Sequence, residues 1–380
     1  MNLTRLDEKN EKNTMPPKAQ CRAYLRQQAG QVPAEPASLA DLIIPDEMTK
    51  TKDAPGQPEE RFLLYDSAND ETYDGGRIVI FSSDWGLEKL ALSLHWAADG
   101  TFKVSPTLFQ QLYTVHATTL GVTVPCVYGL LEDKTELTYR QTFNQIRAAI
   151  LLRHPDAEGI YGTVITDLER AAMNSFQEVF PEKQCSTCFF HLSQAVWRKL
   201  QSLGLQRHYA EDADFAVQVR CLPAIAFLPT ADIRAAFQEV VGVLPDECVD
   251  LITYFENTFI GRELGGRWRP PLYAPDEWTQ YARTLDGLGR TTNAVEGWHR
   301  RFAGKAGSHP STFSLVTQIQ AEEAHWRVEI GKVVAGATPR HRSAIWERVS
   351  ERVTALTRRW RDGDVGTAHF LRGIAHNFTF

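Results

Sequence analysis

The sequence predicts an α/β fold built on a mixed five-stranded sheet, with an α-helical insertion and a helical C-terminal extension. Two observations carry this prediction. Three strand-like runs follow one another between residues 95 and 131, and Gly121 provides the turn between the second and the third. Two further strand-like runs then alternate with helical patterns, as expected where crossover helices join parallel strands.

The individual elements follow from the pattern of apolar residues. Phe143, Ile146 and Ile150 recur at helical spacing, whereas Pro181 and Gly204 each end a helix. In chain order we expect a strand over 77–81, a helix over 87–94, strands over 95–104, 111–119 and 122–131, a helix over 139–154, a strand over 162–166, a helix over 168–180, a strand over 185–190 and a helix over 192–203. From residue 95 onward the order is β-β-β-α-β-α-β-α, which is similar to that of the ribonuclease-H-like fold.

The rest of the chain is polar at its start and helical towards its end. Helices are expected over 231–242, 246–259, 293–302, 313–334 and 339–361, and a short helical patch near 22–28. The expected domains are a flexible polar lead-in (1–60), the first part of the ribonuclease-H-like core (61–204), an α-helical insertion (205–290), return helices that complete the core (291–335) and a basic helical extension (336–380).

Composition excludes several classes of protein. With 380 residues, 43% of them hydrophobic, the chain can build a substantial core. No run of about 18 apolar residues predicts a transmembrane helix, and the polar start lacks the apolar stretch of a signal peptide. The six cysteines are scattered, apart from the pair Cys185 and Cys188, so no disulfide framework is expected. We therefore expect a protein of the cytosol or nucleus.

Charge is distributed unevenly along the chain. The net charge is −6, but residues 297–361 hold 12 Lys and Arg against 5 Glu. A basic C-terminal third on an acidic body is compatible with a nucleic-acid partner, although a solvated helical face would have the same composition.

Three acidic residues stand at the ends of different elements. Asp99 lies in the first core strand, Asp167 follows the fourth, and Glu296 opens a late helix. The first and fourth strands are neighbours in a ribonuclease-H-like sheet, so both aspartates can meet at one edge. Phosphoryl transfer by two metal ions about 3.5–4 Å apart needs such a set of carboxylates, and Mg²⁺ prefers oxygen ligands. Each acid also has a purely structural interpretation. Asp99 could belong to a turn, Asp167 could cap the following helix, and Glu296 could form a capping box with Asn293.

Other polar residues accompany these acids. His299 and Arg300 share a helix face with Glu296, so a metal ligand and cationic groups would point the same way. Such an arrangement suits the binding of a phosphate backbone. Cys188 and His191 form a Cys-x-x-His motif, which could be half of a zinc site. No second pair of ligands follows at suitable spacing, so zinc is not expected and a structural role is favoured. A cysteine nucleophile has no local signature, and no glycine-rich phosphate loop is present.

Taken together, six short sequence motifs around these residues resemble the transposase domain of Mutator-like elements, the MULE transposases. The resemblance spans roughly residues 60–330 and is carried by HWAADGTFKV (95–104), FQQLY (109–113), VITDLERAA (164–172), CFFHLSQ (188–194), YFENTFIG (254–261) and TNAVEGWH (292–299). It is closest to the members that occur as isolated genes in invertebrates.

This resemblance implies a DDE catalytic core with Asp99, Asp167 and Glu296 as metal-binding catalytic acids and two Mg²⁺ or Mn²⁺ ions as cofactors. It places Cys188 and His191 in the C-x-x-H motif of the family. It also implies DNA cleavage and strand transfer in the nucleus. Residues 1–60 contain one cysteine and no histidine, so the N-terminal zinc finger of many family members is not expected here.

Several functions stay open from the sequence. The leading one is a DDE transposase, and enzymatic activity itself is left undecided. The alternatives are a domesticated, catalytically silent module that binds DNA or protein, and a nuclease acting on RNA–DNA hybrids. DNA is the expected partner, with contacts at His299, Arg300, Arg301 and Lys305. A homo-oligomer is left open, and neither a membrane nor a small-molecule cofactor is expected.

Overall fold

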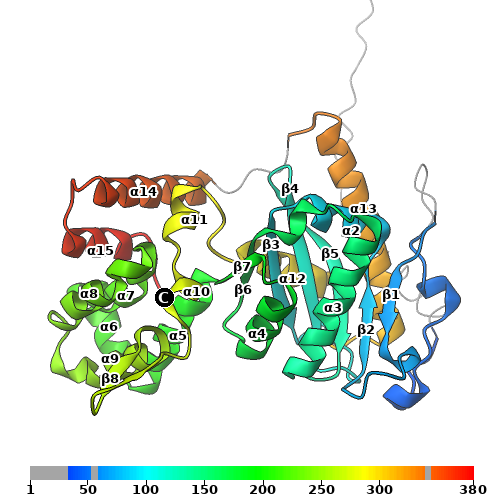
Figure 1. Ribbon diagram of the computed structural model, residues 1–380, viewed down its shortest axis with the longest axis horizontal. Coiled ribbons are helices and arrows are strands. Elements are labelled where there is room, and N and C mark those ends of the chain that lie inside the picture. Colours follow the sequence, from blue (N-terminus) through cyan, green and yellow to red (C-terminus); the bar gives the residue numbers. More distant parts are fainter. Residues whose placement is uncertain (1–32, 53–58, 339–343) are drawn as a thin grey trace, which may run out of the picture.

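The protein is described by a computed structural model that covers residues 33–52, 59–338 and 344–380. Two parts lie side by side in Figure 1, namely a sheet flanked by helices and a helical part in which the insertion and the C-terminal helices come together. The helical patch expected near residues 22–28 and the start of the helix expected over 339–361 lie outside the described residues.

The sheet has seven strands in the order β1-β2-β5-β4-β3-β6-β7. They are β1 (Leu63–Asp66), β2 (Ile78–Phe81), β3 (His95–Thr101), β4 (Gln111–Thr119), β5 (Val122–Leu131), β6 (Gly162–Thr166) and β7 (Lys183–Thr187). The strands β3, β4 and β5 form an antiparallel meander, while β6 pairs in parallel with both β3 and β7. These five strands form the expected ribonuclease-H-like sheet. The predicted strand count was too low, because β1 and β2 extend the sheet beyond β5.

Helices cover both faces of this sheet. One face packs against α2 (Asp84–Leu92), α3 (Glu136–Arg153) and α4 (Arg170–Val179), and the other against α12 (Asn293–Ala306) and α13 (Thr312–Val334). Central strands covered in this way are buried on both faces, and the first seven residues of β4 are all buried. The return of α12 to the sheet after the long insertion is what places Glu296 near β3.

The helical part begins with α5 (Phe189–Ser202), which continues directly from β7. Its other elements are α6 (Gln206–Glu211), α7 (Ala213–Ala224), η5 (Ile225–Phe227), α8 (Thr230–Val241), η6 (Asp246–Cys248), α9 (Val249–Phe255), the π-helix η7 (Glu256–Ile260), β8 (Arg262–Leu264), β9 (Arg267–Arg269), α10 (Pro275–Trp278) and α11 (Tyr281–Leu285). The C-terminal helices α14 (Ala344–Arg361) and α15 (Thr367–Ala375) pack on this part, α14 against α11 and α15 against α7. The predicted basic extension is therefore docked on the insertion.

Three local details differ from the sequence-based expectations. The strand expected over 185–190 ends at Thr187, and Phe189 already begins α5, with Cys188 as its N-cap. The helix expected from residue 168 begins at Arg170, and its N-cap is Glu169.

The third difference concerns the polar lead-in. Leu42 and Met48 are buried against the α13 face of the sheet, next to the short 3₁₀ helices η1 (Leu39–Asp41) and η2 (Asp46–Met48). Part of the segment 33–52 therefore contributes to the core of the sheet part. Two more 3₁₀ helices, η3 (Ser67–Asn69) and η4 (Glu158–Ile160), lie in the sheet part. The domain boundaries themselves stay a prediction. Within the described ranges, no helix is long and apolar enough to cross a membrane.

Candidate functional site

The two aspartates lie side by side towards the carboxyl ends of the neighbouring strands β3 and β6. The parallel ladder between β3 and β6 pairs Ala97 with Ile165, and Asp99 and Asp167 each follow two residues later. Side chains two residues apart on a strand point to the same face, so this register brings the two carboxyl groups together. Asp99 is only 6% exposed. The cap alternative for Asp167 is not what the structure shows, since Glu169 occupies the N-cap position of α4.

Glu296 lies on the first turn of α12, which packs against β3. The N-cap of this helix is Thr292, which makes no side-chain cap hydrogen bond, and Asn293 is already the first helical residue. The capping box between Asn293 and Glu296 is therefore not formed. The amide of Glu296 donates to the carbonyl oxygen of Thr292 at 2.9 Å, and its carboxylate has a side-chain hydrogen bond with the same Thr292.

The three carboxyl groups influence one another electrostatically. Burial raises the pKa of Asp99 to about 8, and the neighbouring carboxyl groups of Asp167 and Glu296 add to this shift. Burial and the adjacent Glu169 raise the pKa of Asp167 to about 6, against the opposing charge of Lys134. Burial also raises the pKa of Glu296. Such shifts are expected where like charges gather in a poorly solvated place.

Two of these carboxylate oxygens lack a partner. Oδ1 of Asp167 and Oε1 of Glu296 are buried and accept no hydrogen bond from any described residue. A buried carboxylate oxygen without a donor is costly, and a divalent cation with oxygen ligands would compensate it.

His299 supports Asp99 from the side of α12. Its Nδ1 lies 3.6 Å from Oδ2 of Asp99, and its Nε2 lies 3.1 Å from Oγ1 of Thr114. The Thr114 hydroxyl donates to the Asp99 carbonyl oxygen at 3.2 Å, and His116 contacts the same hydroxyl. Burial lowers the pKa of His299 to about 4, so its imidazole is neutral at pH 7. A position this deep does not favour the predicted DNA contact at His299.

The other predicted DNA contacts lie on the surface of α12. Arg300, Arg301 and Lys305 are exposed. Lys305 forms an ion pair with Glu322 at 2.9 Å, so part of its charge is neutralised. Arg300 is close enough to Glu296 to oppose the rise in its pKa.

The Cys-x-x-His motif lies directly beside Glu296. Cys188 is fully buried, and Nε2 of His191 lies 3.8 Å from Oε1 of Glu296. The possible ligand atoms of Cys188, His191 and Glu296 all lie within 4.8 Å of one another. A structural role of this motif near the site was expected, but its contact with Glu296 was not, because nothing local in the sequence connects residues 188–191 with residue 296.

Sequence reasoning also missed two residues of the site. Glu169 follows Asp167 by two positions and is held by Lys134 at 2.6 Å and by the Tyr139 hydroxyl at 2.9 Å. Thr114 faces Asp99 across the β3–β4 pair. The string Asp-Leu-Glu after β6 was a signal for Glu169, whereas Thr114 had none.

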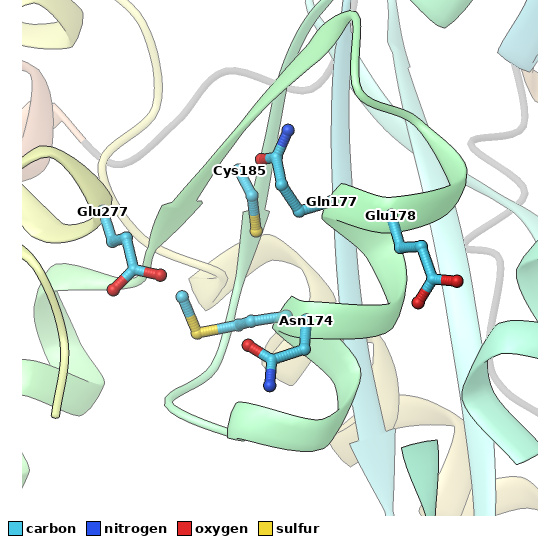
Figure 2. Close-up of a pocket in the computed structure, with 6 residues that line it drawn as sticks. Asn174, Gln177, Glu178, Cys185 and Glu277 are labelled. Atoms are coloured by element: carbon cyan, nitrogen blue, oxygen red, sulfur yellow. The ribbon is translucent and has the colours of Figure 1, made fainter. Parts of the chain in front are cut away.

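A separate cavity of about 400 Å³ lies between α4, β7 and α10. Its lining residues are Met173, Asn174, Gln177, Glu178, Cys185 and Glu277. Figure 2 shows the α4 side chains Asn174 and Glu178 on one side and Glu277 on the other. None of the three carboxylates of the candidate site lines this cavity, so the two features are distinct.

Comparison with known proteins assigns the segment that carries both aspartates. Residues 95–195 match the MULE transposase domain. The resemblance inferred from the sequence motifs is confirmed for this segment, which is similar to a transposase domain. The MULE segment contains Asp99, Asp167, Cys188 and His191, and it ends before Glu296.

One curated relative is similar over a longer stretch. It is the PKS-NRPS hybrid synthetase cheA of Chaetomium globosum, 26% identical over 190 residues. The alignment covers 47% of this chain but only 4% of that protein. The similarity therefore concerns a small part of the relative, and the MULE segment remains the informative match.

Proposed function

We propose that this protein is a MULE-type DDE transposase-like enzyme that cleaves DNA phosphodiester bonds and transfers the resulting strand ends. The observation that carries the proposal is the gathering of Asp99, Asp167 and Glu296 at one edge of a ribonuclease-H-like sheet. Two of these acids lie in the segment that matches the MULE transposase domain.

The residues present fit a pair of divalent cations. Asp99, Asp167 and Glu296 would hold Mg²⁺ or Mn²⁺, since they supply hard oxygen ligands and two of their oxygens accept no hydrogen bond from the described residues. When bound, such ions activate a water molecule and stabilise the charge on the attacking and leaving oxygens.

The protein's own groups have distinct tasks in this proposal. The rigid strands β3 and β6 hold the two aspartates in fixed register, and burial excludes water from Asp99. The exposed Arg300 and Arg301 offer positive charge to the phosphate backbone. In hydrolysis, the water oxygen bonds to phosphorus and the 3′ oxygen leaves as a hydroxyl. That hydroxyl then attacks a phosphorus of the target strand and displaces the 3′ oxygen there.

Cellular context belongs to the same proposal. A DNA substrate implies action in the nucleus, and a homo-oligomer would let two active sites act on two element ends. Zinc has no part in this reaction, and no small-molecule cofactor is required by it.

The test is metal-dependent nicking of supercoiled plasmid DNA, with wild type compared with Asp99→Asn and Glu296→Gln. The wild type should nick DNA with Mg²⁺ or Mn²⁺ and stop in EDTA, while both variants lose the activity. Asp156→Asn, a change of an exposed aspartate, is the matched control and should leave nicking intact. Equal nicking by Asp99→Asn and wild type would contradict the assignment.

The same experiment separates the alternatives. Salt-sensitive DNA binding without cleavage under either metal would point to a catalytically silent binding module. Cleavage of RNA–DNA hybrids but not of duplex DNA would point to a hybrid nuclease.

A further inference from the structure

We propose that the Cys-x-x-His motif is a positioning clamp, in which Cys188 fixes the start of α12 and His191 orients the carboxylate of Glu296. This inference rests on the proposed function, because it assigns a task to residues around the same site. It gives the motif a role through contacts with a segment about a hundred residues away.

The sulfur of Cys188 holds the N-cap residue of α12. Both the amide and the hydroxyl of Thr292 donate to Sγ, at 3.3 and 3.4 Å. Cys188 and Thr292 are both fully buried, so water cannot replace the sulfur if it is removed. The buried amide of Thr292 would then lack an acceptor, and the first turn of α12 would lose its anchor.

Further contacts join the same two segments. The Phe189 amide donates to the carbonyl oxygen of Arg290 at 3.0 Å, and the Cys188 amide donates to that of Thr166 at 2.7 Å. Val295 of α12 packs with Cys188 and Ile165 in a small apolar cluster. The start of α12 is thereby joined to the end of β6, immediately before Asp167.

His191 acts on Glu296 itself. It lies three residues after Cys188 on the first turn of α5, so both side chains face α12. Its Nε2 is 3.8 Å from Oε1 of Glu296, and each side chain is 23% exposed. The imidazole therefore limits how far the Glu296 side chain can swing away from the aspartates.

A zinc ion would be the competing explanation for this trio. Ligands bound tetrahedrally at about 2.0–2.3 Å from zinc lie roughly 3.5 Å apart. Nε2 of His191 lies 3.8 Å from Oε1 of Glu296, all three possible ligand atoms lie within 4.8 Å of one another, and the sulfur already accepts hydrogen bonds from Thr292. The hydrogen bonds from Thr292 to the sulfur therefore favour a positioning role for the motif over zinc coordination.

The first test does not depend on activity. Hydrogen–deuterium exchange of peptides covering residues 292–300 is compared among wild type, Cys188→Ala and Cys188→Ser. The alanine variant should exchange faster in this helix start, while serine, which keeps an acceptor, should restore protection. Cys221→Ala, a buried cysteine of α7, is the matched control and should leave these peptides unchanged. Unchanged protection in Cys188→Ala would overturn the clamp even if the protein proves to have no nuclease activity.

The second test uses cleavage as its readout. The Mn²⁺ concentration for half-maximal nicking should rise about 10- to 100-fold in Cys188→Ala and His191→Ala, with DNA affinity unchanged. Cys188→Ser and His191→Gln should recover most of the loss. Stoichiometric zinc in the purified wild type that is lost in Cys188→Ser would overturn the clamp in favour of a zinc site. If Asp99→Asn nicks as well as wild type while the exchange data hold, the proposed function alone fails.

A different observation carries a second proposal. We infer that the hairpin formed by β8 and β9 in the insertion binds the backbone of duplex DNA. This also rests on the proposed function, since it adds a contact for the same substrate. Figure 1 places β8 at the outer edge of the helical part.

The hairpin concentrates positive charge on an exposed ribbon. Arg262, Arg267 and Arg269 have no acidic partner among the described residues, and all three residues of β9 are exposed. Gly265 and Gly266 form the turn, both with positive φ, which is the backbone that two-residue hairpins prefer. A two-stranded ribbon of this kind fits a groove of duplex DNA.

Trp268 stiffens the ribbon between these arginines. The guanidinium of Arg234 stacks 4.1 Å from the centre of its ring, and the ring stays 47% exposed. Gly261 lies so close to the ring that any side chain there would collide with it. Trp268 therefore packs against Arg234 and Gly261, while Arg267 and Arg269 on either side of it are exposed.

The test is fluorescence anisotropy of a labelled DNA duplex over a range of salt concentrations. The charge reversal Arg267→Glu with Arg269→Glu should weaken binding and reduce the slope against log salt by about 2. The matched control is Arg207→Glu with Arg372→Glu, which changes the net charge equally at arginines already paired with Glu211 and Asp214. Equal affinity of the two double variants would overturn the hairpin proposal. Failure of the wild type to bind DNA at any salt would instead overturn the proposed function.

Discussion

The imidazole of His299 lies between Asp99 and Thr114, with Nδ1 3.6 Å from Oδ2 of Asp99 and Nε2 3.1 Å from the Thr114 hydroxyl. Because this histidine is buried and neutral at pH 7, it can hold one carboxylate orientation without adding a charge. Groups that orient a metal-binding carboxylate in this way are part of a working site.

We predict that His299→Ala lowers metal-dependent nicking about 10- to 100-fold without changing affinity for duplex DNA. The reason is that Asp99 loses its neighbour while the exposed surface of α12 stays intact. Arg300→Ala is the control and should weaken DNA binding instead. A clear loss of DNA affinity in His299→Ala would restore the original DNA-contact prediction.

The metal-free protein should become less stable, relative to Asp99→Asn, as pH rises. Asp99 holds its proton up to pH about 8 when folded, against a usual value of 3.8 when unfolded. Between these values folding takes up a proton, so the free energy of unfolding falls as pH rises and levels off above pH 8. At pH 8 the asparagine variant should be the more stable by about 1–3 kcal/mol.

This prediction is measured by urea unfolding in EDTA between pH 5 and 9. Adding Mg²⁺ should stabilise the wild type by mass action and the variant much less. A pH-independent difference between the two proteins would show that Asp99 ionises normally.

Lys183 of β7 is fully buried and should be needed for stability. Its ammonium group donates to the carbonyl oxygens of Leu94, Gly159 and Tyr161 at 3.2, 2.7 and 2.5 Å, and lies 4.2 Å from the centre of the Trp96 ring. Lys183→Met removes these donors at similar volume and should lower the free energy of unfolding by about 1–3 kcal/mol. Lys332→Met on the exposed surface of α13 is the control in the same urea titration, and an equal effect would contradict the assignment.

Arg170 should fasten the helical insertion to α4. Its guanidinium binds both carboxylate oxygens of Glu277 and the carbonyl oxygen of Leu272, and lies 4.3 Å from the centre of the Tyr273 ring. Arg170→Ala should lower the free energy of local opening by about 1–2 kcal/mol. The opened state would be populated more often, and proteolysis within residues 262–290 should become about 5- to 30-fold faster.

The matched control for that prediction is Arg147→Ala. Arg147 also forms a bidentate pair, with Glu182, but within the sheet part. Proteolysis of residues 262–290 at the same rate in both variants would mean that Arg170 does not fasten the insertion.

Much of the sheet was predictable because its signals are local. The expected strands over 111–119, 122–131 and 162–166 agree with β4, β5 and β6 at both ends. They are rich in β-branched and aromatic residues and bounded by turns, so neighbouring residues alone determine them. The end of β7 was wrong because Phe189 and Phe190 have strand-like side chains, whereas Cys188 caps a helix there.

The candidate site was predictable in composition but not in its contacts. The acids at positions 99, 167 and 296 could be selected from motifs, and the strand order then brought the first two together. The position of Cys188 against Thr292 could not be selected, because 104 residues of chain separate them. Likewise, the burial of His299 depends on which face of α12 meets the sheet.

The sequence by itself determined the five core strands and the presence of an acid at the end of two of them, since short-range periodicity and turn residues carry that information. Only the tertiary structure decided that β1 and β2 widen the sheet, that α14 and α15 dock on the insertion, and that the Cys-x-x-His motif meets Glu296. Those features arise where distant segments bury apolar surface against each other, and which surfaces meet depends on the packing of the whole chain.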